Sequence, residues 1–339
     1  MAWSPNIYVF SVIHFLTGFS GIAYFSIAVI SVLELVGPTK RTMAGLVIEM
    51  VWSVGMMILC TVAYFIRNWR HLQIAVSAPS FVLLFYWMFI PESPRWLLAK
   101  GRKNDALQIL KKMALVNKTE LPDKLGDIEC ETRLGFKEVV FALLRLVTAM
   151  AYFGLTYNVG RIAGDLYANF LLTTVVEFMG YMLCLILSSK CGRKPVMVGS
   201  LVLAGLAVIV SVVYISASQW ATVALSMIGK CGVSASFGNV FVYTPELFPT
   251  NVRSFVTGSC NTGARIGTLI SPYIVNIADF VPGHFGTSIA YIIFGGCTVS
   301  IGLTCMILPE TLNSYLPETL EEAVNLQRRF PITVSLDFI

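Results

Sequence analysis

The chain has 339 residues, of which 56% are hydrophobic and only 13% are charged, against about 25% charged in ordinary soluble domains. This composition excludes a typical soluble globular protein and favours a polytopic membrane protein. The formal net charge of +5 comes from basic residues that lie between apolar runs, so we interpret it as an orientation signal and expect no nucleic-acid partner.

A transmembrane helix needs about 20 consecutive, mostly apolar residues. Nine such runs occur, at residues 8–34, 43–66, 72–90, 138–158, 167–188, 195–215, 220–243, 255–277 and 286–308. The first run follows no basic segment and is too long for a signal peptide, so we interpret it as a true span. The pattern predicts an all-α membrane protein with about nine transmembrane helices.

The Lys and Arg residues indicate the orientation of these spans. If the runs cross in succession, most of the 24 basic residues fall on one side, and ten of them lie between Arg95 and Lys137, both included. Cytoplasmic connections hold the positive charge. We therefore expect the C-terminus to be cytoplasmic and, after nine crossings, Met1 to be outside.

A short sequence occurs twice, as ELVGPTKRT at residues 34–42 and as ELFPTNVRS at residues 246–254. Each copy lies at the cytoplasmic end of a span and is followed, at a similar distance, by a span that ends in Pro-Glu. This pattern indicates a parallel duplication, as in transporters built from two equivalent bundles. Only one span precedes the first copy, whereas four lie between the third span and the second copy. The first half is therefore expected to lack three spans.

Six stretches carry a resemblance to a known family. They are PESPRWLLAKGR (91–102), YFGL (152–155), TTVVEF (173–178), GRKP (192–195), YTPELFPTNVR (243–253) and ARIGTLISPY (264–273). The chain resembles the major facilitator superfamily and, within it, the solute carrier family 22 transporters of organic cations, organic anions and carnitine. The resemblance runs from residue 1 to about residue 323. It implies the superfamily fold, truncated at its N-terminus, and a multi-pass location that we expect to be the plasma membrane.

With this resemblance the chain divides into four parts. Residues 1–91 are expected to be the remnant of an N-terminal six-helix bundle, with three spans, and residues 138–310 to form a C-terminal six-helix bundle. Residues 92–137 form a cytoplasmic connection, in which apolar residues alternate with Lys and Arg at helical spacing and predict an amphipathic helix on the membrane surface. Residues 311–339 are a cytoplasmic tail.

Charged residues near the cytoplasmic helix ends are candidates for a gating latch. They are Glu34, Arg41, Glu92, Arg95, Arg193, Glu246 and Arg253. A Glu and an Arg at a helix end can pair with each other or with the neighbouring bundle. A solvated turn after each helix is the alternative. Ahead of GRKP, Ser188 and Ser189 replace the acidic residue that the resemblance implies, so a simple basic anchor is an equal alternative there.

The resemblance also implies a substrate site. Its candidate residues are Tyr152, Phe153, Glu177, Phe237 and Arg265. Arg265 lies within a span, between two glycines that let another backbone approach closely. In the family the position of Arg265 is basic in organic anion and carnitine-type members, and the aromatic positions hold ammonium groups by cation–π attraction. A structural Arg265 that pairs with a carboxylate such as Glu177, and aromatic residues that only pack, remain alternatives.

The sequence therefore predicts a secondary transporter of small organic ions that works by alternating access, with carnitine-like zwitterions or organic anions favoured over simple cations. The alternative is a transport-incompetent fragment or short isoform that acts only as a membrane-associated protein. No catalytic His-Asp or His-Glu arrangement occurs in the spans, so we expect no enzyme. The eight scattered cysteines suggest no zinc site, no cofactor is expected, and no motif identifies a coupling ion.

Overall fold

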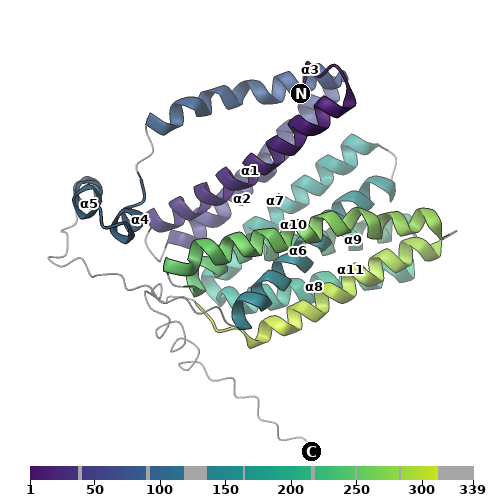
Figure 1. The fold of residues 1–339 in the computed structure, drawn as a ribbon. Helices are drawn as coiled ribbons and strands as arrows, with labels where there is room; N and C mark the ends of the chain where they lie inside the picture. Colours follow the sequence, from purple (N-terminus) through teal and green to yellow (C-terminus); the bar gives the residue numbers. More distant parts are fainter. Residues whose placement is uncertain are drawn as a thin grey trace, which may run out of the picture. The chain divides into compact units, whose positions relative to one another are not determined.

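The computed structural model describes residues 1–36, 40–88, 92–117, 136–162, 165–214, 218–248, 250–281 and 284–311. Every regular element in these ranges is a helix (Figure 1). The all-α prediction is thus confirmed for the described part of the chain. The chain divides into two compact units, Met1–Gly37 with Gly55–Cys130, and Pro38–Val54 with Glu131–Ile339. Helix α2 (Arg41–Phe65) contributes its first part to the second unit and the rest to the first.

The first unit holds the helices that precede the long connection. They are α1 (Ile7–Leu35), the second part of α2, α3 (Trp69–Ser77), the 3-10 helix η2 (Ala78–Met88), α4 (Pro94–Ala99) and α5 (Lys103–Asn117). The Asn6 side chain accepts a hydrogen bond from the Val9 amide at 2.9 Å and caps α1. Phe10 of α1 meets Trp69 of α3 edge-on, with ring centroids 5.8 Å apart.

The second unit consists of the first part of α2 and six long helices. They are α6 (Phe136–Ile162), α7 (Leu166–Cys191), α8 (Arg193–Tyr214), α9 (Gln219–Leu247), α10 (Thr250–Phe280) and α11 (His284–Thr304), which continues into the short 3-10 helix η3 (Cys305–Ile307). Helix α6 packs against α10 and α9, α9 also packs against α7 and α8, and α11 packs against α8 (Figure 1). These six helices lie between Phe136 and Thr304, and the division of the chain into two bundles stays a prediction.

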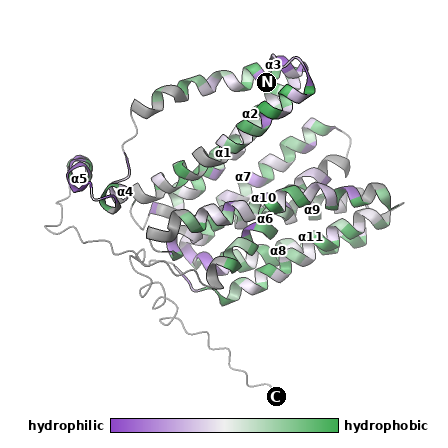
Figure 2. Cartoon of the chain, viewed as in Figure 1, coloured by the Kyte–Doolittle hydropathy of each residue, from purple (hydrophilic) through white to green (hydrophobic). Residues whose placement is uncertain are grey.

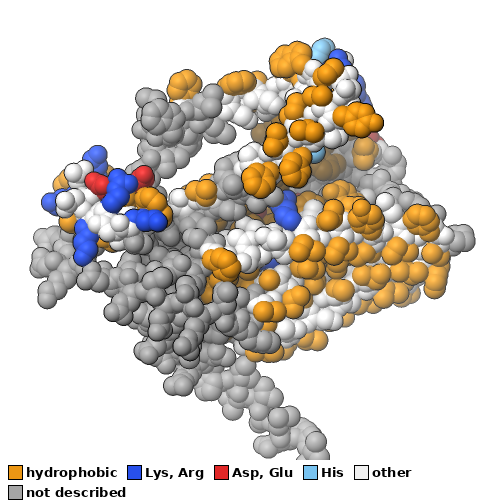
Figure 3. All heavy atoms as spheres, in the orientation of Figure 1, with side chains coloured by type: hydrophobic (Ala, Val, Ile, Leu, Met, Phe, Trp, Pro, Cys, Tyr) orange, Lys and Arg blue, Asp and Glu red, His pale blue; other side chains and the backbone are white. Residues whose placement is uncertain are grey.

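Among the described residues, six helices are long and apolar enough to cross a membrane: one in α2 and five in the second unit, α6, α7, α8, α9 and α11. Apolar residues run along these helices (Figure 2), and many apolar side chains are exposed on the visible face of the second unit (Figure 3). The predicted run 72–90 is divided between α3 and η2, and α10 is rich in Gly, Ser, Thr and Asn. The count of nine spans stays a prediction.

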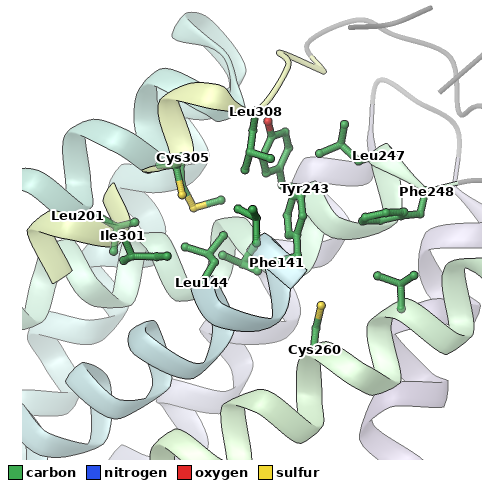
Figure 4. Close-up of a cluster of buried hydrophobic side chains, with 14 residues drawn as sticks. Phe141, Leu144, Leu201, Tyr243, Leu247, Phe248, Cys260, Ile301, Cys305 and Leu308 are labelled. Carbon is green, nitrogen blue, oxygen red and sulfur yellow. The ribbon is translucent and has the colours of Figure 1, made fainter. Parts of the chain in front are cut away.

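A buried apolar cluster joins five long helices of the second unit, α6, α8, α9, α10 and α11, at one end of the unit (Figure 4). Its centre is Phe141 of α6, whose ring centroid lies 5.5 Å from that of Tyr243 and 5.6 Å from that of Phe248. Cys260 of α10 and Leu201 of α8 pack into the same cluster. Aromatic pairs at these separations stabilise beyond their burial alone. The cluster therefore fixes the axial position of α6 against α9.

Helices α6 and α10 approach each other at two glycines of α10. A methyl group on Gly263 would lie 2.8 Å from the carbonyl oxygen of Ala142 in α6. A methyl group on Gly267 would overlap the carbonyl oxygen of Leu146. Small residues of this kind allow close backbone contact between membrane helices. The prediction that the two glycines beside Arg265 admit another backbone is confirmed.

Candidate functional site

Four ionisable side chains lie together in the interior of the second unit: Glu49 of α2, Arg145 of α6, Glu177 of α7 and Lys230 of α9. Each is 3% exposed or less. Charged groups inside a membrane protein are costly unless they pair or line a substrate pathway. With two acids and two bases the cluster is formally neutral. We call these four residues the charge cluster.

Helical spacing explains how side chains from separate helices converge. Arg145 and Tyr152 are seven residues apart in α6, and Lys230 and Phe237 are seven apart in α9. Seven residues make about two helical turns, so each pair lies on one face of its helix. These faces turn inward, because all four residues are buried or half-buried in the packed bundle.

Glu177 and Lys230 form a buried ion pair. The Lys230 Nζ lies 3.5 Å from Glu177 Oε2 and donates a 2.7 Å hydrogen bond to Thr156. Glu177 Oε1 accepts hydrogen bonds from the hydroxyls of Ser53 at 3.1 Å and Tyr181 at 3.5 Å. Four helices therefore meet at this pair, which has the additional hydrogen bonds that a buried pair requires.

The three predicted aromatic residues gather beside this pair. The Tyr152 ring stacks on Phe237 with centroids 4.9 Å apart and meets Phe153 edge-on at 5.1 Å. Lys230 Nζ lies 3.1 Å from the centroid of Tyr152. The Tyr152 ring therefore already contacts a cation, Lys230, and a second ring, Phe237. Phe153 and Phe237, in contrast, are only half-buried.

Arg145 lies against the aromatic group without a hydrogen bond. Its guanidinium carbon is 3.5 Å from the ring centroid of Phe241 and 5.5 Å from that of Phe237. None of its three side-chain nitrogens has a hydrogen-bond partner, although the residue is 1% exposed. Glu49 is near enough for the two charges to interact, and its Oε1 also has no hydrogen-bond partner.

Arg265 lies apart from these contacts. It is exposed on α10, and no hydrogen bond or ion pair joins it to another described residue. The alternative in which Arg265 pairs with Glu177 is not found, because the partners of the Glu177 carboxylate are Lys230, Ser53 and Tyr181. The structure thus brings four of the five predicted substrate residues together, and Arg265 makes no described contact with them.

A second polar cluster brings together two of the predicted latch residues. Arg193 Nε lies 3.3 Å from Glu246 Oε2, and both side chains are buried. The Arg193 guanidinium also donates a 2.6 Å hydrogen bond to Thr42 of α2, and the Thr311 hydroxyl donates one of 2.6 Å to Glu246. In place of an acidic residue ahead of GRKP, the Ser188 carbonyl accepts a 3.5 Å hydrogen bond from Arg193. We call this group the latch cluster.

Glu310 completes the latch cluster from the end of the last helix. Its carboxylate accepts hydrogen bonds from the amides of Arg193 at 2.9 Å and Lys194 at 3.0 Å, the first residues of α8. A carboxylate at a helix N-terminus satisfies free amides and complements the helix dipole. The contact is possible because Gly192, with φ of 100°, turns the chain sharply between α7 and α8.

The Gly192→Ala variant is expected to lower the free energy of unfolding by about 1–3 kcal/mol, since a side chain at this φ is strained. The new methyl group would also lie 2.6 Å from the Glu310 carboxylate. Thermal unfolding of the purified chain in detergent measures the effect. Gly199→Ala on α8 is the matched control, because nothing lies within 4 Å of its added methyl group. Equal stability of the two variants would contradict the assigned role of Gly192.

The other predicted latch residues lie elsewhere or outside the described side chains. Glu92 forms a 3.2 Å ion pair with Arg102, which also pairs with Asp105 at 2.8 Å, and all three are about half exposed. Exposed pairs of this kind stabilise little. For four of the predicted residues the structure describes the helix but not the side chain; these are Glu34, Arg41, Arg95 and Arg253.

Sequence reasoning assigned no role to Glu49, Arg145, Lys230 or Glu310. A usable signal existed for three of them, because an ionisable residue within an apolar span is a functional-site candidate by default. Glu310 carried a weaker signal, the Pro-Glu that ends the last predicted span.

Two family models match the chain. "Sugar (and other) transporter" matches residues 1–138, and "Major Facilitator Superfamily" matches residues 142–332, which is more than half of the chain. The boundary between the two matches falls at the start of α6, where the second unit's six long helices begin.

Curated relatives are similar over almost the whole chain. The organic cation transporter protein of Drosophila melanogaster is 32% identical over 97% of this chain and 64% of its own length. Solute carrier family 22 member 3 of Rattus norvegicus and the organic cation/carnitine transporter 2 of Homo sapiens are each 30% identical over 96% of this chain and 61% of their own length. The chain thus spans 61–64% of the length of these relatives.

A solved structure shares the fold. The proton:xylose symporter XylE from E. coli matches with a TM-score of 0.69 and 18% identity, over 87% of this chain and 69% of the solved chain. At this identity the likeness shows the fold alone. The helical second unit, the family model that covers it and the shared fold agree: the chain belongs to the Major Facilitator Superfamily.

Proposed function

We propose that the chain acts in the secondary transport of small organic ions across the plasma membrane by alternating access. The observation that carries the proposal is one group of side chains: the buried Glu177–Lys230 pair, at which four helices meet, and the aromatic residues beside it. Relatives named as organic cation and carnitine transporters support the substrate class. In this proposal Tyr152, Phe153, Phe237, Glu177 and Arg265 contribute to substrate binding.

The chemistry of these residues favours a zwitterion. Aromatic faces attract an ammonium group, and a guanidinium presents a planar set of donors that matches a carboxylate. A carnitine-like zwitterion uses both features, and an organic anion uses only the second. A simple cation is repelled by Arg265 unless Glu177 offsets that charge. We therefore rank zwitterions first, organic anions second and simple cations third.

We further propose that the latch cluster closes the cytoplasmic side during the transport cycle, with the C-terminus in the cytoplasm. The buried Arg193–Glu246 pair and the Glu310 contact at the start of α8 support this role. Charged pairs at helix ends can break and re-form as the cytoplasmic side opens and closes, since the charges can find partners in both states. The remaining predicted latch residues would act with them on the same side.

A second candidate is a membrane protein that associates with others without transporting a substrate. It is favoured by the contacts of the Glu177–Lys230 pair and the Tyr152 ring, which are satisfied within the protein. Uptake of labelled carnitine into cells tests both candidates. One arm expresses the 339-residue chain, and the other joins it to the part of the Drosophila relative that lies outside the match. Surface-delivered protein that accumulates no ion in either arm would contradict transport and support the second candidate.

The Arg265→Ala variant is expected to reduce uptake of carnitine and organic anions by roughly 10-fold or more, since a charge-assisted hydrogen bond contributes about 1.5–3 kcal/mol. Uptake of simple organic cations is expected to stay equal or to rise, because a repelling charge is removed. Uptake is measured with whichever of the two proteins transports, the 339-residue chain or its fusion with the Drosophila segment. An equal loss for every substrate would show that Arg265 supports the structure and does not recognise a carboxylate.

A further inference from the structure

Three cations are buried in the described part of the chain: Arg145, Arg193 and Lys230. Arg193 has a carboxylate partner in Glu246, and Lys230 has one in Glu177. Among these three, Arg145 alone has neither an ion pair nor a hydrogen bond with another described residue. An unpaired buried charge is strongly destabilising, so its presence calls for a reason other than stability.

We infer that Arg145 binds the carboxylate of the substrate, as a specificity-determining residue in addition to Arg265. The inference rests on the proposed function and assigns a role to the buried guanidinium of the described part of the chain in which none of the three nitrogens has a hydrogen-bond partner. Guanidinium groups carry five N–H donors in a fork that matches a carboxylate. The described neighbours of Arg145 leave these donors unused.

The residues around Arg145 attract its guanidinium but accept no hydrogen bonds from its N–H groups. Phe241, at 3.5 Å from the guanidinium carbon, and Phe237, at 5.5 Å, attract the positive charge through their ring faces. A ring face supplies no oxygen acceptor for the N–H groups, so these contacts fix the side chain and leave its hydrogen bonds for a ligand. A rigid, pre-positioned donor binds with less loss of side-chain entropy.

Arg145 is also connected to the rest of the candidate substrate site. The Phe237 ring that approaches Arg145 stacks at 4.9 Å on Tyr152, beside the Glu177–Lys230 pair. Glu49 adds an acceptor, because its Oε1 is buried without a hydrogen-bond partner. An unsatisfied guanidinium and an unsatisfied carboxylate oxygen in one charge cluster are complementary to a compact molecule that carries both charges. These groups therefore suit a short zwitterion.

Arg145 would have a purely structural role if, in another rotamer, it paired directly with Glu49. Measurements of ligand binding and of thermal stability distinguish this role from substrate binding. If Arg145 serves binding, Arg145→Gln removes an unpaired buried charge, and thermal unfolding of the ligand-free chain stays unchanged or shifts upward. If the residue serves a structural pair, the variant unfolds at lower temperature, and Arg145→Gln with Glu49→Gln restores stability.

The binding experiment uses the purified chain in detergent with two probes, carnitine and its carboxamide, which keeps the ammonium group and loses the negative charge. For Arg145→Gln we expect carnitine to bind roughly 10- to 100-fold more weakly and the carboxamide to bind with unchanged affinity. Arg265→Gln is measured in parallel. The inference would be overturned if Arg145→Gln still preferred carnitine over the carboxamide as strongly as the unaltered chain, or if only Arg265→Gln lost affinity for carnitine. The proposed function would stand in either case.

Failure of the proposed function has a different signature. If the unaltered chain binds neither probe, the proposed zwitterion site is absent from it, and the role of Arg145 is refuted with it. Weaker binding of both probes by the same factor, together with lower thermal stability, would assign Arg145 to the structure. Selective loss of carnitine with unchanged stability would support carboxylate recognition.

Discussion

Replacing Lys230 by methionine is expected to lower the free energy of unfolding by about 3–5 kcal/mol, because removal of one partner of a buried ion pair leaves the other charge uncompensated. The methionine fills a similar volume, so the effect comes from the charge. After the change, Glu177 would retain only its hydrogen bonds from Ser53 and Tyr181. Thermal unfolding of the purified chain in detergent measures the loss.

Two further variants show whether this loss belongs to the pair. Adding Glu177→Gln to Lys230→Met removes the stranded charge and is expected to restore most of the stability, since neutral replacements of a whole buried pair are often tolerated. Lys190→Met, at the exposed end of α7, is the control for loss of a positive charge and is expected to have little effect. A Lys230→Met variant as stable as the control would refute the assigned pairing.

The second large effect is expected at Gly267, where α10 meets α6. In Gly267→Ala the added methyl group would overlap the Leu146 carbonyl oxygen and lie 3.1 Å from the Met150 amide nitrogen. Backbone atoms cannot rotate away as a side chain can, so the two helices must separate. Overpacking of this kind costs about 1–3 kcal/mol or more. We expect a lower unfolding temperature and a weaker α6–α10 contact.

Two alanine variants on the same helix calibrate this result. At Gly263 the methyl group would lie 2.8 Å from the Ala142 carbonyl oxygen, so an intermediate loss is expected. At Gly258 nothing lies within 4 Å, and alanine is expected to stabilise the helix by up to about 1 kcal/mol. If Gly267→Ala matched Gly258→Ala in stability, the close contact of α6 with α10 would be contradicted.

Helix positions follow from the sequence because a membrane span needs a long apolar run, and polar residues or glycine end it. The run predicted at 167–188 corresponds to α7 (Leu166–Cys191), and the run at 195–215 to α8 (Arg193–Tyr214). The run at 72–90 differs, because α3 gives way to η2 at Ala78. Pro79 follows directly, and proline disfavours an α-helical residue before it and donates no backbone hydrogen bond.

The partners of the buried charges could not be predicted in the same way. Lys230 lies mid-helix in α9 and Glu177 mid-helix in α7, and their contact depends on how two helices pack and rotate. A single sequence carries no direct signal for that register. Nor does hydropathy reveal that the first part of α2, which holds Glu49, belongs to the second unit, whereas the part from Gly55 onward belongs to the first. The aromatic group was predictable only through the resemblance, which placed Tyr152, Phe153 and Phe237 in one site.

The central claim is that the substrate binds at the aromatic and charged group of the second unit. Equilibrium binding of labelled carnitine to the purified chain tests it most directly, with Phe237→Ala compared with Phe285→Ala, an exposed residue at the start of α11. Loss of a desolvated cation–π contact weakens binding by about 2 kcal/mol, roughly 30-fold. The account predicts that loss for Phe237→Ala and unchanged binding for Phe285→Ala. Equal affinity of the two variants would contradict it.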